Sequence, residues 1–205
     1  MKTTSVTLAS TVLVLSGFAL QNSASPAVNQ ARAQLGAELR TLAALAQKIA
    51  KTSTKEEKAR GWLELNRQAQ KVAEDMNAVF PDTTIKGDTI SPPQAQQLAQ
   101  RATSYGVRVD FCEPGGNWAA DNQGYFKYLD LWPNGSEADE ATWMGPLGNA
   151  AFCGDSEGSV EELRDFIGHR KQFLQKFPNS RFAAQARQDI KAAQAQLQEA
   201  PRSCR

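Results

Sequence analysis

Carboxylates are the first side chains of this sequence that suggest chemistry, because several gather in the middle of the chain. They are Asp130, Glu137, Asp139 and Glu140. Two carboxylates at a suitable separation can hydrolyse a glycoside, one as the acid and the other as base or nucleophile. Acids near the start of a helix also have a simpler role, because they offset the helix dipole. The second interpretation is favoured here, and we assign no catalytic residue.

The only histidine of the chain, His169, limits the other catalytic arrangements. A Ser-His-Asp triad or a Cys-His pair would need it, yet its neighbours recur at helical spacing, which is typical of a structural histidine. Asp130–Gly135 slightly resembles the start of a calcium loop, but Trp132 stands at a ligand position and Ala141 at the closing position. We therefore predict no metal site and no cofactor.

Aromatic residues lie close to the same acids and suggest recognition of a partner. Rings combined with carboxylates can bind a basic or aromatic peptide. Trp118 precedes the expected helix in a loop, so it is the best candidate for an exposed contact. The alternative is that the rings only fill the core. The predicted binding residues are Trp118, Tyr125, Trp143, Asp139 and Glu140.

Two similar segments position these residues. Tyr128–Ala141 reads YLDLWPNGSEADEA and Phe173–Ala186 reads FLQKFPNSRFAAQA, with Pro133 and Pro178 offset by 45 residues. Proline cannot continue the preceding helix, because it lacks the N–H and its ring clashes with the turn before. The Ala-x-x-Ala that follows puts two small side chains on one face, where another helix can approach closely. The pattern predicts two helix–elbow–helix units.

The second of these segments resembles the inter-repeat junction of tetratricopeptide-like proteins of the bacterial envelope, whose repeats end in an aromatic-Pro-x-Ser turn. The resemblance extends over roughly residues 122–200. It implies an α-solenoid of stacked helix pairs that works as a protein-interaction module. The offset of 45 residues exceeds the usual repeat of about 34 residues, and a Gly-rich insert at 145–158 explains the excess. The first unit is therefore expected to be degenerate or capping.

The rest of the chain completes a prediction of an all-α fold. Residues 28–80 contain two runs of apolar residues at intervals of three and four, which predict an antiparallel helical hairpin. A polar linker at 81–93 leads to a tetratricopeptide-like helical domain at 94–200 that includes the insert. Around Val109 apolar and polar residues alternate, so we expect at most one short strand, without a partner strand.

Local signals mark the start of two of the expected helices. Thr54–Glu57 and Ser159–Glu162 both have the spacing of a capping box, in which a hydroxyl and a carboxylate satisfy free N–H groups at a helix start.

Residues 1–27 have the pattern of a secretory signal peptide. Lys2 precedes an apolar run, Val6–Leu20, and small residues at Ala24 and Ala27 offer cleavage sites. The run of 15 residues is shorter than the roughly 20 that span a bilayer. We expect cleavage, and the alternative is an uncleaved anchor. The predicted protein is exported, periplasmic or secreted, with no stable membrane span after cleavage.

Three cysteines, Cys112, Cys153 and Cys204, follow this segment. In an oxidising compartment we expect one disulfide and one remaining thiol. Cys112–Cys153 is the favoured pair, because both residues lie in Gly-bearing loops on either side of the first elbow, although the sequence does not fix the pairing. Cys204 would then be a free thiol that can link a homodimer.

The charges are balanced, with 23 Lys and Arg against 22 Asp and Glu and a formal net charge of +1. A nearly neutral chain without a basic stripe is unsuited to nucleic acid. We therefore predict an exported, non-enzymatic interaction or scaffold module of the bacterial envelope with a protein or peptide partner. Two alternatives remain, a hydrolase using the acids near Asp130–Glu140 and a structural oligomer linked through Cys204.

Overall fold

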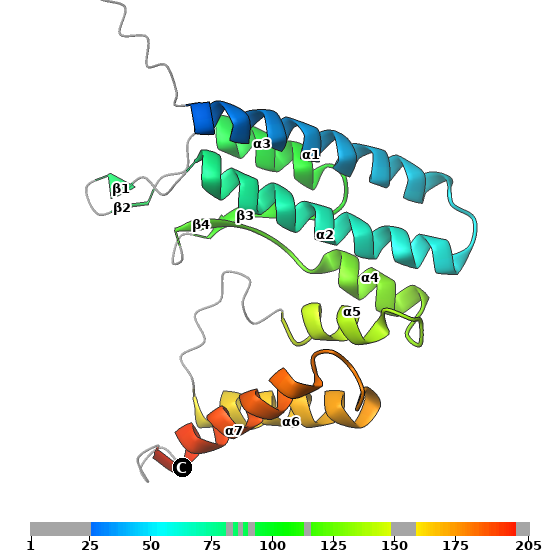
Figure 1. Cartoon of the computed structure of the whole chain (residues 1–205), viewed down its shortest axis with the longest axis vertical. Coiled ribbons are helices and arrows are strands. Elements are labelled where there is room, and N and C mark those ends of the chain that lie inside the picture. Colours follow the sequence, from blue (N-terminus) through cyan, green and yellow to red (C-terminus); the bar gives the residue numbers. More distant parts are fainter. Residues whose placement is uncertain are drawn as a thin grey trace, which may run out of the picture.

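The computed structural model describes residues 26–80, 84–85, 88–89, 93–112, 116–148 and 159–199. Within these ranges the chain forms seven helices and two antiparallel two-stranded sheets (Figure 1). The helices are α1 (Pro26–Lys51), α2 (Lys55–Val79), α3 (Pro93–Thr103), α4 (Gln123–Leu131), α5 (Ala138–Met144), α6 (Val160–Lys176) and α7 (Ala183–Glu199). The strands are β1 (Thr84–Ile85), β2 (Asp88–Thr89), β3 (Val109–Cys112) and β4 (Asn117–Ala120). The mostly helical architecture confirms the all-α class.

Several predicted features lie outside the described residues. They are the signal peptide as far as residue 25, most of the linker, residues 149–158 of the insert, Cys153 and Cys204. The predicted division into domains stays a prediction.

Helix α2 is the central element of the described structure. It packs antiparallel against α1 and also contacts β4 and α4. Helices α6 and α7 pair at the end of the molecule that lies opposite α1 (Figure 1). Thr54 caps the start of α2 by accepting from the Glu57 N–H at 3.3 Å, which is one half of the predicted capping box. The Glu57 carboxylate accepts from the Thr54 hydroxyl at 2.7 Å. Gly61 lets α1 approach, because a Cβ there would lie 2.6 Å from Cγ1 of Ile49.

Two buried apolar clusters share α2. In the first, leucines of α1 such as Leu42 and residues of α2 such as Val72 pack with α3, Val109 and Trp118. The second joins the start of α2, at Leu63, to α4 and α5. Because α2 contributes to both clusters, the helical hairpin shares one interior with α3, the β3–β4 hairpin, α4 and α5.

The expectation of at most one short strand without a partner was wrong. Strand β3 pairs with β4 in an antiparallel register that sets Val109 opposite Ala120 and Phe111 opposite Trp118. A second, shorter hairpin, β1–β2, falls within the predicted linker. The sequence of β4, Asn-Trp-Ala-Ala, neither alternates nor favours strands, since Asn and Ala are depleted in sheets. Contacts with α2 must therefore determine this strand.

Two asparagines of α2 supply those contacts. Asn77 donates through Nδ2 to the Trp118 carbonyl at 2.9 Å and accepts from the Trp118 N–H at 2.6 Å. Asn66, which is fully buried, donates to the Asp121 carbonyl at 2.9 Å and accepts from the Gly124 N–H at 2.7 Å. A side-chain amide has the donor and acceptor of a peptide group, so each asparagine can pair with backbone N–H and carbonyl groups as another peptide group would. These pairs fix β4 and the start of α4 on α2.

Two elbows, residues 132–137 and 177–182, have the same backbone hydrogen bonds. The aromatic residue before each proline ends the preceding helix, and its N–H donates to the carbonyl four residues earlier at 2.8 Å. Its backbone φ and ψ are −148° and 68° at Trp132 and −130° and 62° at Phe177. The first residue of each following helix donates to the carbonyl three residues earlier, at 3.1 Å and 3.0 Å. Positions 45 residues apart are thus equivalent in backbone structure.

Asp75 is a carboxylate held in the α1–α2 interface. Its Oδ1 accepts from Nε2 of Gln34 at 3.2 Å, while Oδ2 is shielded from solvent and has no hydrogen-bond partner among the described residues. Burial, and then the negative charges of Glu38 and Glu74, raise its pKa. The charged form therefore opposes folding at neutral pH.

We expect Asp75→Asn to increase the free energy of unfolding at pH 7, because the amide keeps the shape and removes the charge. The raised pKa means that the folded state binds the proton more tightly than the unfolded state. The advantage of the variant should therefore shrink with falling pH and disappear below the ordinary Asp pKa of about 3.9. Urea unfolding at neutral and acid pH measures this. Asp130→Asn, which removes an exposed carboxylate, is the control, and a less stable Asp75→Asn at pH 7 would contradict the prediction.

Candidate functional site

The predicted binding residues do not form one surface, and the expectation that Trp118 is an exposed loop contact was wrong. Trp118 lies in β4 with 2% of its surface exposed. Its ring packs edge-on against Phe111, with 5.3 Å between the centroids, and its backbone is held by Asn77. Trp118 therefore belongs to the first buried cluster. Its Nε1 is buried without a hydrogen-bond partner among the described residues.

Tyr125 is also an interior residue, with 1% of its surface exposed. Its hydroxyl donates to Oε1 of Gln70 at 3.3 Å. Burial, followed by the charge of Glu140, raises the pKa of Tyr125 to about 12. The side chain fills the space between α2 and α4 and is not available to a partner.

Trp143 joins α5 to the α6–α7 pair. Its ring stacks on Phe182 at a centroid distance of 5.2 Å and an interplanar angle of 10°, and it meets Phe173 at 5.2 Å. The guanidinium of Arg170 lies 4.3 Å from the same ring. Trp143 is partly exposed, yet these contacts explain its presence without a ligand.

Asp139 and Glu140 connect α5 to distant parts of the chain. Ser180, in the second elbow, donates to Oδ2 of Asp139 at 2.7 Å. Glu140 is 8% exposed and accepts from Nε of Arg67 at 2.7 Å and from a terminal nitrogen of Arg181 at 2.6 Å. The hydrogen bond with Glu140 is the main reason that the pKa of Arg67 is raised above its usual range. Both acids are therefore engaged in structural contacts.

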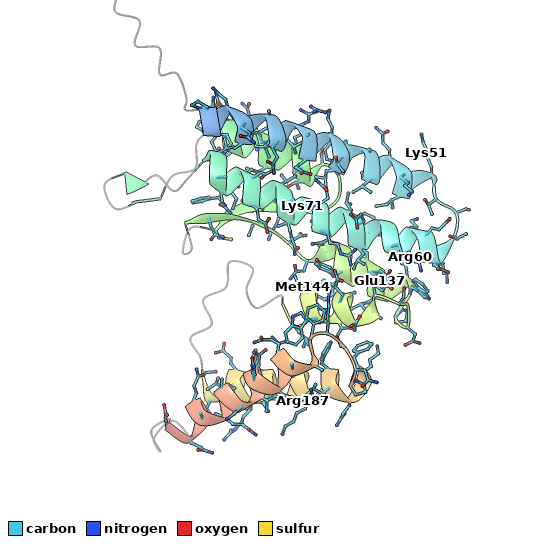
Figure 2. The ribbon with its side chains drawn as sticks, in the orientation of Figure 1. Lys51, Arg60, Lys71, Glu137, Met144 and Arg187 are labelled. Atoms are coloured by element: carbon cyan, nitrogen blue, oxygen red, sulfur yellow. The ribbon has the colours of Figure 1, made fainter. Side chains whose placement is uncertain are left out.

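Glu137 makes the corresponding contacts within the first elbow. It accepts through Oε2 from the Tyr128 hydroxyl at 3.1 Å, and its own N–H donates back to that hydroxyl at 3.1 Å. Oε1 lies 3.8 Å from Nε of Arg60, and Figure 2 shows Arg60 and Glu137 close together. Burial alone would raise the pKa of Glu137, but hydrogen bonds from Ser136 and Tyr128 and the charge of Arg60 outweigh it and lower the pKa. This carboxylate holds the elbow against α2.

A cleft that the sequence did not predict lies between α6 and α7. Its volume is about 660 Å³. Apolar side chains line it together with polar ones, and the exposed polar residues, which we call its edge, are Glu162, Asp165, His169 and Gln196. The lining residues are Pro146, Leu147, Glu162, Leu163, Asp165, Phe166, His169, Arg170, Asp189, Ala192, Ala193 and Gln196. We call this the α6–α7 cleft.

The base of the α6–α7 cleft contains one cation whose charge is already matched. Arg170 is 8% exposed, and its Nε lies 3.0 Å from Oδ2 of Asp189. Its guanidinium also covers the Phe166 ring at 4.6 Å. The other oxygen of Asp189 accepts from Gln185 at 2.7 Å. The carboxylates that remain exposed at the edge are Glu162 and Asp165.

Helix periodicity explains why only part of the α6–α7 cleft could have been found from the sequence. Phe166, His169 and Arg170 recur at intervals of three and four, so their common face on α6 was visible. The opposite wall comes from Ala192, Ala193 and Gln196 of α7, which carry no signal of a site. Small residues opposite an aromatic ring become a hollow only when the two helices pack.

Comparisons with protein-family models, with curated proteins and with solved structures found no match. Among the described helices, none is both long and apolar enough to cross a membrane. Within the described ranges, no three or more His, Cys, Asp or Glu side chains are grouped so that they could hold a metal ion.

Removing the charge of Glu140 should weaken the attachment of the second elbow. We expect Glu140→Gln to lower the free energy of unfolding by about 1–2 kcal/mol, less than for a fully buried pair because both arginines retain some hydration. Glu64→Gln is the matched control, since Glu64 contacts the same Arg67 at 3.3 Å with half its side chain exposed.

The control should change stability by no more than about 0.5 kcal/mol. Denaturant unfolding of both variants measures the difference. Equal effects of the two substitutions would mean that the buried position of Glu140 has no special importance.

Proposed function

We propose that this protein is an exported, non-enzymatic interaction or scaffold module of the bacterial envelope that binds a protein or peptide partner in the α6–α7 cleft. The observation that supports the proposal most directly is the cleft itself, with apolar walls and a polar edge. The two equivalent elbows support a tetratricopeptide-like stacking of helix pairs, in which helices present surfaces to partners. Export is inferred from residues 1–27 alone.

The size and lining of the α6–α7 cleft suit a side chain or a short segment of a partner. Ligand sites of about 300–1,000 Å³ are common, with mostly apolar walls and a few polar groups that orient the ligand. Leu163 and Phe166 are partly exposed in this cleft and Ala192 is exposed. Burying these surfaces would favour binding by the hydrophobic effect, at about 25 cal/mol per Å².

The hydrolase alternative has less support from the geometry. Asp139 and Glu140 are engaged by Ser180 and by two arginines, and Glu137 by Tyr128. A catalytic pair would need carboxylates that converge on a shared open space. The contacts of these acids instead explain their presence as connectors between elements.

Filling the cleft tests the proposed function. Ala192 is exposed on the cleft wall, and Ala184 is an exposed alanine of the same helix that does not line it. We expect Ala192→Trp to abolish partners that the wild type captures by crosslinking in an envelope extract, while Ala184→Trp retains them. Circular dichroism of both variants checks folding. Partners that survive Ala192→Trp would show that the cleft is not their binding site.

The disulfide prediction can be tested separately. Cys112 is buried, with 4% of its surface exposed, while Cys153 and Cys204 lie outside the described residues. We expect mass spectrometry of a non-reduced digest to find Cys112 joined to Cys153. Non-reducing electrophoresis should then show either monomer or a dimer that Cys204→Ser abolishes. A Cys112–Cys204 peptide would overturn the favoured pairing.

A further inference from the structure

We propose that the occupant of the α6–α7 cleft is a cationic segment of a partner, with apolar side chains for the walls and lysine or arginine for the edge. This inference rests on the proposed function and identifies the chemistry of its ligand.

The lining of the cleft has more negative than positive groups. Three carboxylates, Glu162, Asp165 and Asp189, face one cation, Arg170. The Arg170–Asp189 pair is internally balanced, because the two atoms that face each other are 3.0 Å apart and both side chains are at least four-fifths covered, with exposed fractions of 10% and 17%. The negative charges of the lining that no cation in it balances are therefore those of Glu162 and Asp165, both exposed on α6.

The two remaining carboxylates differ in what they do for the helix. Glu162 belongs to the capping box of α6 and accepts from the Ser159 N–H at 2.8 Å. Asp165 lies one turn further along on the same helix, at the cleft edge. Asp165 can therefore be changed without removing the helix cap, which makes it the residue of choice for a test.

A cationic segment satisfies both parts of the lining. Its apolar side chains would contact Leu163 and Phe166, and its ammonium or guanidinium groups would remain partly hydrated beside Asp165 and Glu162. A cation at a partly exposed edge gains a modest Coulomb energy and keeps most of its hydration. An anionic segment would meet the same two carboxylates as like charges.

Fluorescence anisotropy with two labelled peptides tests the proposal on the full chain. Both peptides have about twelve residues and the same leucines and alanines at helical spacing. One has lysines at its polar positions and the other has glutamates. We expect the lysine peptide to bind at least about tenfold more tightly and to lose affinity as salt rises from about 50 mM to 300 mM.

Two charge reversals provide the matched comparison. Asp165→Lys should weaken binding of the lysine peptide about fivefold or more, whereas Asp130→Lys, the same change at an exposed site on α4 that does not line the cleft, should change it by less than about twofold. Three outcomes would overturn the proposal: equal affinity for the two peptides, preference for the glutamate peptide, or equal effects of the two reversals. Each of them would still leave the cleft as a binding site.

The Ala192→Trp variant separates this failure from failure of the proposed function. If it leaves the affinity for the lysine peptide unchanged, the peptide binds elsewhere and the inference of a cationic occupant is overturned, whereas the proposed function fails only if the crosslinked partners also survive Ala192→Trp. If the lysine peptide binds only after residues 149–158, other than Cys153, are replaced by a glycine-serine linker, then a segment of this chain is the occupant, and the inference of a cationic partner is overturned.

Discussion

The bridge from Glu140 to two arginines is the interaction on which the arrangement of the helices most depends. Glu140 belongs to α5, Arg67 to α2 and Arg181 to the elbow that precedes α7. One carboxylate therefore joins three segments that are far apart in the sequence. A buried carboxylate is costly unless its oxygens are paired, so a register in which Glu140 met neither arginine would be disfavoured. The bridge specifies which faces of the helices meet.

Two asparagine side chains pair in a similar way with buried groups of the backbone. Asn66 and Asn77 meet peptide groups with the donor and acceptor that each group needs. Because unpaired buried peptide groups are expensive, these amides fix a strand that its own sequence does not favour. The two apolar clusters that share α2 supply the driving force, and the polar pairs select one arrangement among the ways in which those surfaces could pack.

Local signals predicted the parts of the structure that depend on few neighbours. The capping box at Ser159 and the side-chain cap of Thr54 are present because each involves only four consecutive residues. The elbows at Pro133 and Pro178 follow from the covalent geometry of proline. By contrast, β4 depends on Asn77, which lies 41 residues before Trp118, and no local pattern records such a partner. The predicted exposure of Trp118 failed for the same reason.

The sequence indicated aromatic and acidic residues as a site, and the structure uses most of them as internal connectors. Tyr125 fills a core, Asp139 binds Ser180 and Glu140 binds the arginines. The α6–α7 cleft is different, because its walls come from residues that are individually unremarkable, such as Ala192. A hollow depends on how two helix surfaces fit, and this fit is a property of the packed pair.

The contribution of α2 to both apolar clusters has a consequence for how the protein opens. Neither cluster can lose its packing without disturbing the helix that both share, so the part of the chain from α1 to α5 should behave as one cooperative unit. The α6–α7 pair contributes no buried residue to either cluster and is attached mainly through side chains of α5 and the second elbow. It is therefore the natural first segment to detach in local unfolding. A ligand bound between α6 and α7 would make this local unfolding rarer, because a ligand stabilises the state that binds it.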